Sequence, residues 1–208
     1  MSIFVKRFAM LVALLSAIPL RAAAGDDLLA RMAALNPDLH SYSATVHAHV
    51  ALVTFPFLAT DIVATYYHKD PDLNKLQVTS GLPVIAQTFS QLFAHIEPPS
   101  RWAALYTVNK TRDDGKDASL TLVPRSSGNV TQIEVSVDDA SATIRSMRWD
   151  YANGGWATVD QHYSVIQGNT VVTSQTGHVE EPSYKGDVTT TLSEYQLNPA
   201  LPDSLFTQ

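Results

Sequence analysis

The chain of 208 residues contains no cysteine. Disulfide bonds therefore cannot stabilise its fold, although proteins of oxidising compartments commonly rely on them. The cysteine on which a bacterial lipoprotein carries its lipid is missing as well. Stability has to come from an apolar core, and 45% of the residues are hydrophobic.

Charged residues are scarce, and basic ones are the scarcer kind. They make up 16% of the sequence, with 14 Lys and Arg against 20 Asp and Glu. Apart from the adjacent Lys6 and Arg7, basic residues do not gather in a cluster. Nucleic acids and anionic lipid headgroups bind to basic patches, so neither is expected as a partner.

No apolar run reaches the ~20 residues that a helix needs to cross a bilayer. Residues 8–20 are almost wholly apolar, follow Lys6 and Arg7, and precede three alanines at 22–24. This order of basic, apolar and small residues is typical of a cleavable signal peptide. We expect residues 1–24 to be removed and the rest to be periplasmic, without a membrane-spanning segment. The 11 basic and 20 acidic residues after position 24 then give a net charge of −9.

No linker, repeat or low-complexity stretch divides residues 25–208, which predicts a single domain. Apolar residues recur at helical spacing over 25–39 and again over 83–96, so a helix is predicted in each segment. Elsewhere the apolar residues alternate with period two, as in strands with one buried face.

Gly, Asn and Asp separate the alternating segments and predict antiparallel hairpins. The predicted strands cover residues 43–53, 60–68, 75–79, 102–109, 119–124, 130–137, 143–151, 157–166, 170–178 and 187–197. The fold class is therefore α+β, with a large curved antiparallel sheet of about nine to eleven strands covered by two or three helices. If the sheet curls, its concave side forms an apolar trough that suits a hydrophobic ligand.

Four segments resemble the LolA/LolB-like periplasmic lipoprotein carriers. Residues 41–46 (SYSATV) are similar to that family's first strand, and 66–76 (YYHKDPDLNKL) to the connection between its second and third strands. Residues 120–124 (LTLVP) resemble the middle of its sheet, and 195–206 (YQLNPALPDSLF) its closing strand and tail. The resemblance implies an open half-barrel that holds acyl chains in a cavity. It also implies a lipid or a lipidated protein as cargo, with an inner-membrane release complex or an outer-membrane acceptor as partner.

One position departs from the family pattern. After the proline of the second-to-third strand connection the carriers are expected to have an arginine, whereas the nearest basic residue here is Lys75. A lysine lacks the planar fork with which arginine makes two parallel hydrogen bonds. We therefore predict a general lipid-binding protein and retain Lys75 as a candidate polar contact to the ligand.

Large apolar side chains on the predicted trough and its lid are the candidate ligand contacts. The segment Phe55-Pro56-Phe57-Leu58 is notable because a connection between strands is normally polar, and exposed apolar residues often mark an interaction site. For Phe89, Phe93 and Trp102, packing in the core is an equal alternative. The candidate contacts are Val46, Val50, Leu52, Phe55, Phe57, Leu58, Ile85, Phe89, Leu92, Phe93, Trp102, Leu122 and Val135.

Enzymatic function has little support in the sequence. The nucleophile elbow Gly-x-Ser-x-Gly, phosphate-binding glycine loops and His-Glu-x-x-His are all absent. His47 and His49 lie on one side of a predicted strand and could bind a metal with His68 or a carboxylate as third ligand, but a solvated pair is the expected arrangement. The sequence thus predicts no enzyme, cofactor or metal. An envelope interaction or sensor module that uses the same fold without carrying lipid is the alternative function.

Overall fold

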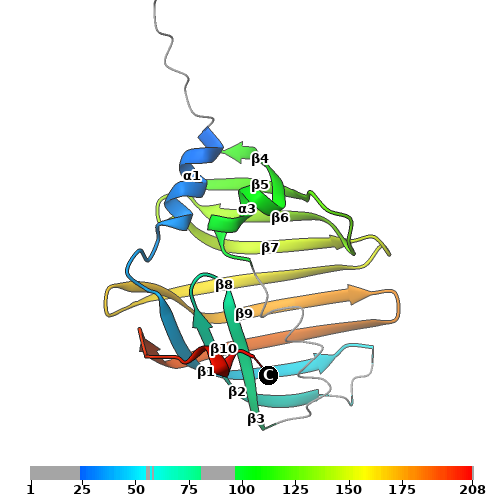
Figure 1. The fold of residues 1–208 in the computed structure, drawn as a ribbon. Coiled ribbons are helices and arrows are strands. Elements are labelled where there is room, and N and C mark those ends of the chain that lie inside the picture. The colour runs from blue at the N-terminus through cyan, green and yellow to red at the C-terminus, as the bar shows by residue number, and fades with distance from the viewer. Residues whose placement is uncertain (1–23, 55–56, 58, 81–96, 208) are drawn as a thin grey trace, which may run out of the picture.

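A computed structural model describes residues 24–54, 57, 59–80 and 97–207 of the chain (Figure 1). The predicted signal peptide and the predicted helix over 83–96 lie outside these residues, apart from Ala24. So do six of the candidate ligand contacts, which are Phe55, Leu58, Ile85, Phe89, Leu92 and Phe93.

The described strands form one antiparallel sheet in the order β3-β2-β1-β10-β9-β8-β7-β6-β5-β4. Only the pairing of β1 with β10 joins strands that are distant in sequence; the others are hairpin or meander neighbours. The strands are β1 (Ser41–Leu52), β2 (Ala59–Lys69), β3 (Leu73–Ser80), β4 (Tyr106–Asp113), β5 (Asp117–Pro124), β6 (Val130–Asp138), β7 (Thr143–Tyr151), β8 (Trp156–Ile166), β9 (Asn169–Glu181) and β10 (Tyr184–Leu197). The predicted α+β class with a large antiparallel sheet is confirmed.

Helix α1 (Ala24–Ala33) is shorter than the predicted 25–39. The chain leaves the helix before Asn36, whose side-chain amide accepts a hydrogen bond from the Thr170 N–H at 2.9 Å and donates one to the Thr170 carbonyl at 2.8 Å. Asn36 also precedes a proline, a position that disfavours helical geometry. These two hydrogen bonds hold the connection between α1 and β1 against the β8–β9 hairpin.

The predicted strand over 102–109 is wrong in its first part. Pro99–Leu105 forms a short helix, α3, and β4 begins only at Tyr106. Pro99 stands in the first turn of α3, where its missing N–H costs no hydrogen bond. Within the described residues, no helix is long and apolar enough to cross a membrane.

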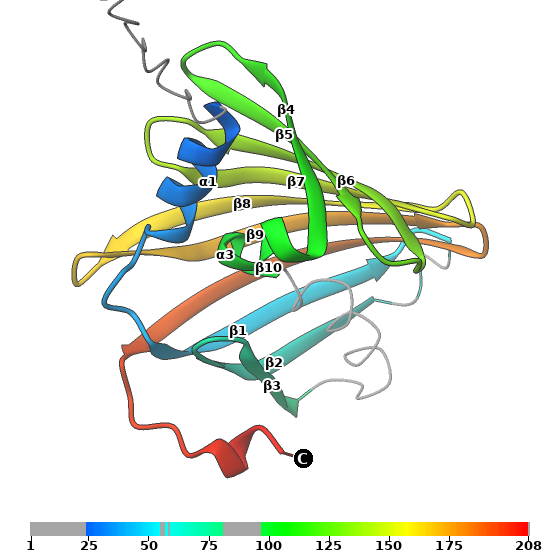
Figure 2. The same cartoon turned by 45° about the horizontal axis from the view of Figure 1, so that its top comes forward.

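The sheet is strongly curved, and α1 and α3 lie on its concave side (Figures 1 and 2). Register shifts interrupt five of the nine strand pairings, among them β1–β10, β2–β3 and β8–β9. Such bulges bend a strand and increase its twist. The curvature follows from them.

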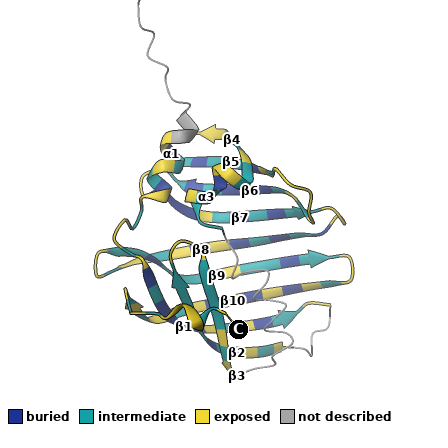
Figure 3. Cartoon of the chain, in the orientation of Figure 1, coloured by how far each residue is buried: buried dark blue, intermediate teal, exposed yellow. Residues whose placement is uncertain are grey.

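The main core fills the concave side beneath α1 and α3. Buried residues alternate with more exposed ones along the strands (Figure 3), as the period-two pattern predicted. The buried members of this main core are Leu28, Met32, Trp102, Ala118, Leu120, Leu122, Ile133, Val135, Val137, Ala142, Ile144, Met147, Trp149, Ala157, Val159 and Val179. These residues come from α1, α3, strands β5 to β9 and the β6–β7 turn, so side chains of the protein fill one half of the concave face.

The C-terminal segment, including the short 3-10 helix Asp203–Leu205, is held by the face of β1, β2 and β3 that bears Ser41 and Lys69. The strand pairing places Ser41 and Lys69 on the face of the sheet opposite to the one that bears the apolar side chains of β1. The hydrogen bonds run from Ser41 Oγ to the Pro199 carbonyl (2.8 Å), Lys69 Nζ to the Leu201 carbonyl (2.9 Å) and Lys75 Nζ to the Leu205 carbonyl (2.7 Å). The tail therefore lies on the convex face.

Candidate functional site

A second apolar cluster occupies the other half of the concave face. Val50, Ile62 and Val188 are buried there, and Ala48, Leu52 and Val78 pack against them half-buried. All come from strands, so no helix residue of the described chain belongs to this cluster. We call the concave-face side chains of these strands the apolar stripe: Val46, Ala48, Val50, Leu52, Ile62, Ala64, Val78, Val188 and Leu192.

The structure divides the described candidate contacts between two regions. Val46, Val50 and Leu52 lie together in the apolar stripe. Trp102, Leu122 and Val135 belong to the main core, where each is at most 1% exposed. Phe57 is 82% exposed in the connection between β1 and β2. Of the candidate contacts that the structure describes, the three from β1 lie where a wall could face a ligand.

Lys75 lies on the convex face of the sheet. In β3 the side chains of Leu76 and Val78 share the concave face, so Lys75 between Asn74 and Leu76 points the other way. Its Nζ donates a hydrogen bond to the Leu205 carbonyl. The structure does not bring Lys75 to the apolar stripe, and we do not retain it as a ligand contact.

Four tyrosines continue the concave face at one end of the apolar stripe, and we call them the tyrosine cluster: Tyr42, Tyr66, Tyr163 and Tyr195. The ring centroid of Tyr42 is 5.8 Å from that of Tyr66 and 5.8 Å from that of Tyr195. His68 is also close, with 5.1 Å between its ring centroid and that of Tyr42. All four tyrosines are half-buried. Sequence analysis did not single them out, although Tyr42 and Tyr66 share the period-two alternation of Val46 and Ala64.

A bulge turns one member of this cluster into the concave face. In β10, Glu194 has a φ of +53° at the shift between Ser43 and Thr45 of the partner strand. The extra residue reverses the alternation, so that Tyr195 faces Tyr42. Tyr163 needs no bulge of its own strand, because it continues the alternation of Val159 and Gln161 in β8, and the extra residue of the β8–β9 shift lies in β9. Bulges often redirect a side chain near a functional site.

The hydroxyl protons of three cluster members are already donated within the protein. Tyr66 Oη donates to Asn74 Oδ1 at 2.6 Å, and Tyr163 Oη donates to Gln161 Oε1 at 2.5 Å. Tyr195 Oη donates to the Val172 carbonyl. Asn74 Oδ1 also contacts His68 Nδ1 at 2.8 Å, so this nitrogen carries the proton when the ring is neutral. The cluster is therefore held in place by hydrogen bonds from its hydroxyl groups to neighbouring strands.

The pKa values of the cluster reflect its enclosure by protein. Burial raises the pKa of Tyr42 from 10.0 to about 12, and a hydrogen bond with Tyr66 offsets part of that rise. Burial, followed by the proximity of Tyr42, raises the pKa of Tyr66 well above 10.0. Burial likewise raises the pKa of Tyr163 and of Tyr195. At neutral pH all four are uncharged phenols.

These shifts predict a loss of stability in alkali. Between pH 10 and about 12 the unfolded chain releases the proton of Tyr42 and the folded chain keeps it, so the free energy of unfolding falls with pH. Each such tyrosine contributes a slope of about 1.4 kcal/mol per pH unit. We expect Tyr42→Phe to reduce this slope in urea unfolding measured across that range. Equal slopes for Tyr42→Phe and the unaltered protein would contradict the assignment.

An ion pair links α3 to the β2–β3 turn at the end where the tyrosine cluster lies. Arg101 Nη1 of α3 is 2.8 Å from Asp72 Oδ2 and 3.3 Å from Glu97 Oε2. Asn74, the partner of Tyr66 and His68, donates through Nδ2 to the Asp72 carbonyl at 3.2 Å. The two halves of the concave face are thus joined there, and the charge of Arg101 is balanced by its two carboxylate partners.

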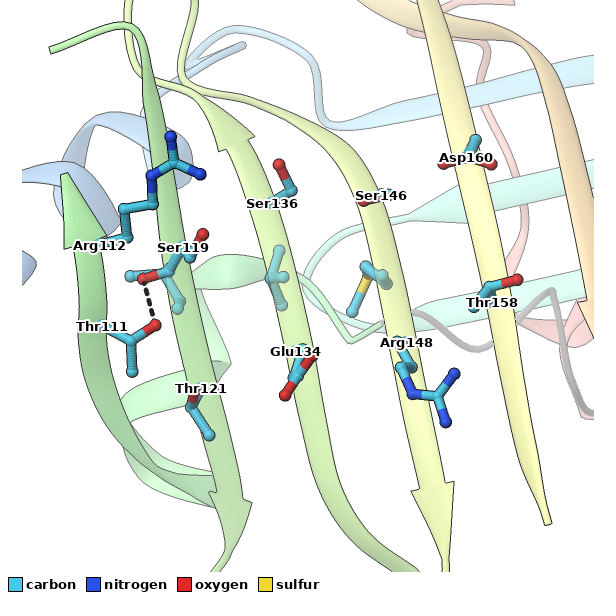
Figure 4. A pocket seen from close by; sticks show the side chains of 13 residues that line it. Thr111, Arg112, Ser119, Thr121, Glu134, Ser136, Ser146, Arg148, Thr158 and Asp160 are labelled. Atoms are coloured by element: carbon cyan, nitrogen blue, oxygen red, sulfur yellow. Dashed lines mark hydrogen bonds between the residues drawn. The ribbon is translucent and has the colours of Figure 1, made fainter. Parts of the chain in front are cut away.

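The convex face carries an open polar groove of about 450 Å³ over β4 to β8 (Figure 4). Short hydroxyl side chains form its floor, and charged groups such as Arg112, Glu134 and Arg148 lie among them. Thr111 Oγ1 donates to the Ser119 carbonyl at 3.2 Å. Leu120, Val135 and Met147 also line the groove, but most of its lining side chains carry hydroxyl or charged groups, so it suits a polar ligand better than a hydrophobic one.

His47 and His49 are both exposed on the convex face, as the alternation of β1 predicted. His49 Nδ1 contacts Asp61 Oδ1 at 2.7 Å, whereas His68 lies on the opposite face in the tyrosine cluster. The three histidines therefore do not meet. Over the described ranges, no three residues among His, Asp and Glu are grouped to hold a metal ion.

The fold is shared with solved structures of low sequence identity. A DUF1329 family protein from Desulfovibrio piger is 12% identical, with 89% of this chain and 96% of that chain covered and a TM-score of 0.64. A LolA superfamily protein from Nitrosomonas europaea is 14% identical, covering 90% and 99% of the two chains with a TM-score of 0.55. A domain from Vibrio parahaemolyticus classed as an outer-membrane lipoprotein-sorting protein is 11% identical, covering 88% and 96% with a TM-score of 0.55.

No protein-family model and no curated protein matches the sequence. Identities of 11% to 14% establish a common fold alone. The LolA-like fold that the four sequence segments implied is confirmed at this level.

Proposed function

We propose that the protein is a periplasmic carrier or chaperone that binds a lipid, or the acyl chains of a lipidated protein, on the concave face of its sheet. The observation that carries the proposal is the apolar stripe. It lies on the inner face of a curved sheet, and the described helices pack on the other half of that face. The LolA-like fold supports the proposal, because one of the similar structures is a LolA superfamily protein and another is named for outer-membrane lipoprotein sorting.

Hydrophobic burial alone provides enough affinity for this role. Each methylene group removed from water contributes about 0.8 kcal/mol, so one acyl chain binds usefully without a charged contact. A carrier of this kind works without catalysis and without a cofactor. Its cargo would be received from an inner-membrane release complex or passed to an outer-membrane acceptor, and a signal peptide at residues 1–24 would place it between the two membranes.

Native mass spectrometry of the gently purified protein tests the proposal. We expect copurified acyl species, or uptake of a fluorescent fatty acid by the delipidated protein with saturable binding. A protein that carries no lipid and takes up no fatty acid would instead support the interaction-module alternative.

Phe57 is the residue through which we expect the carrier to meet its donor surface. It is 82% exposed, whereas soluble proteins usually bury a side chain of this size. We expect Phe57→Asp to slow lipid uptake from vesicles several-fold in a stopped-flow transfer assay, because a carboxylate in place of the ring opposes contact with an apolar surface.

Val165→Asp is the matched control for Phe57→Asp. Val165 is also an exposed apolar residue, at 71%, but it stands near the β8–β9 turn. Equal uptake rates for both variants and the unaltered protein would show that Phe57 takes no part in transfer.

A further inference from the structure

The tyrosine cluster and the apolar stripe are parts of one continuous surface. Strand β1 carries Tyr42, Val46 and Val50 on the same face without interruption, and β2 carries Tyr66 and Ile62 beside them. An acyl chain lying along the stripe would therefore have one end at the phenol rings. A lipid has one end that is polar, so this arrangement matches the two ends of a lipid molecule.

Charge on this surface restricts the kind of polar group it can accept. The lysines of the surrounding strands are Lys69, Lys75 and Lys185, and all three lie on the convex face, bonded to the C-terminal tail or to Glu180. Arg101 reaches the nearby turn with its charge balanced by Asp72 and Glu97. An anionic phosphate or carboxylate headgroup would find no unpaired basic side chain here among the described residues, and its desolvation would be costly.

The hydrogen-bonding capacity of the tyrosine cluster further restricts the headgroup that this surface can accept. Tyr66 and Tyr163 donate their protons within the protein, and their oxygens already accept from the Tyr42 hydroxyl and the Ile144 N–H. The oxygens of Tyr42 and Tyr195, whose protons are also donated within the protein, therefore remain as the acceptors of the cluster. Gln161 is 9% exposed and accepts the Tyr163 hydroxyl through Oε1, which leaves its amide N–H groups to act as donors. The cluster thus offers phenol oxygens as acceptors and one side-chain amide as donor. A lipid headgroup with hydroxyl groups suits it, because a hydroxyl can donate to a phenol oxygen and accept from the amide.

We propose that the tyrosine cluster with Gln161 is the headgroup subsite of the carrier and that it selects an uncharged lipid bearing free hydroxyl groups, such as a monoacylglycerol. This inference rests on the proposed lipid-binding function. It adds to that function the polarity and charge of the lipid, which the apolar stripe alone does not specify.

Three ligands with the same acyl chain test the selection in a competition assay against a fluorescent fatty acid. The ligands are monooleoylglycerol, methyl oleate and oleate. Because a hydrogen bond to a buried neutral group contributes about 0.5–1.5 kcal/mol, two such bonds predict a preference of about tenfold for monooleoylglycerol over methyl oleate. Oleate at neutral pH is expected to bind more weakly than monooleoylglycerol.

Variants then assign the preference to the cluster. We expect the double variant Tyr42→Phe/Tyr66→Phe to bind methyl oleate as before and to lose the tenfold preference. Tyr67→Phe is the matched control, since Tyr67 neighbours Tyr66 and lies on the opposite face. The comparison of ligands on the unaltered protein needs no variant, so it decides the question even if the double variant fails to fold.

The outcomes separate this inference from the proposed function. Binding of all three ligands without preference, or tightest binding of oleate, overturns the hydroxyl-selective subsite and leaves lipid carriage standing. A preference that survives in the double variant overturns the assignment to these tyrosines. Absence of binding for every acyl ligand overturns the proposed function, and the subsite with it.

Discussion

Replacing Trp102 with alanine is expected to lower the free energy of unfolding by about 3–5 kcal/mol, the usual cost of removing a large buried aromatic side chain. Trp102 is 1% exposed and stands where α3 meets the main core. Its indole N–H donates to the Glu97 carbonyl at 2.7 Å, so the substitution also leaves that acceptor without its partner. Urea unfolding followed by circular dichroism measures the change.

Trp156→Ala is the matched control for this prediction. Trp156 is half-buried on the convex face, with the Arg148 guanidinium 4.4 Å from its ring centre. A cation–π contact of this kind contributes about 0.5–1 kcal/mol at an exposed site. Equal losses for the two variants would contradict the view that α3 closes one half of the concave face by packing on the sheet.

Replacing Ala48 with tryptophan is expected to weaken acyl-chain binding by about tenfold while leaving the protein folded. Ala48 is half-buried in the apolar stripe, directly opposite Ile62 of β2 and Thr190 of β10. An indole ring there would occupy the space of at least two methylene groups of a ligand, and their lost burial amounts to about 1.6 kcal/mol. Titration with a fluorescent fatty acid measures the affinity.

His47→Trp places the same ring on the exposed side of the same strand and serves as the control. If the concave face at Ala48 were already filled by protein, Ala48→Trp would overpack it and cost about 1–3 kcal/mol of stability. Unchanged affinity together with such a loss of stability would contradict a ligand-binding role for the stripe.

The strands were predictable because the sheet buries one face. Period-two alternation located every strand except β4 to within about three residues at each end. The hairpin turns were predicted from Gly, Asn and Asp. The start of β4 was not predictable in the same way. Its preceding helix α3 spans only seven residues, too few for a helical period to emerge. Pro99 in its first turn was the available signal.

The site was predicted less well than the fold, for a physical reason. Alternation assigns each residue to a face of the sheet only as long as the strand has no bulge. The bulge at Glu194 interrupts the alternation of β10, and no glycine in the sequence marks its position. Tyr195 therefore changes face without a sequence signal. Lys75, in contrast, could have been placed on the convex face from its alternation with Leu76. Leu122 and Val135 were correctly read as inward-facing, but sequence could not show that α1 and α3 would cover them.

Methyl NMR of the protein with a bound acyl ligand locates the chain on the sheet. Addition of monooleoylglycerol should shift the methyl resonances of Val50, Ile62 and Val188 and produce nuclear Overhauser contacts between them and the acyl chain. The methyl groups of Ile133 and Val135, enclosed in the main core, should show neither. Acyl contacts that involve the main core, or a bound ligand that touches none of the stripe residues, would contradict lipid binding on this face.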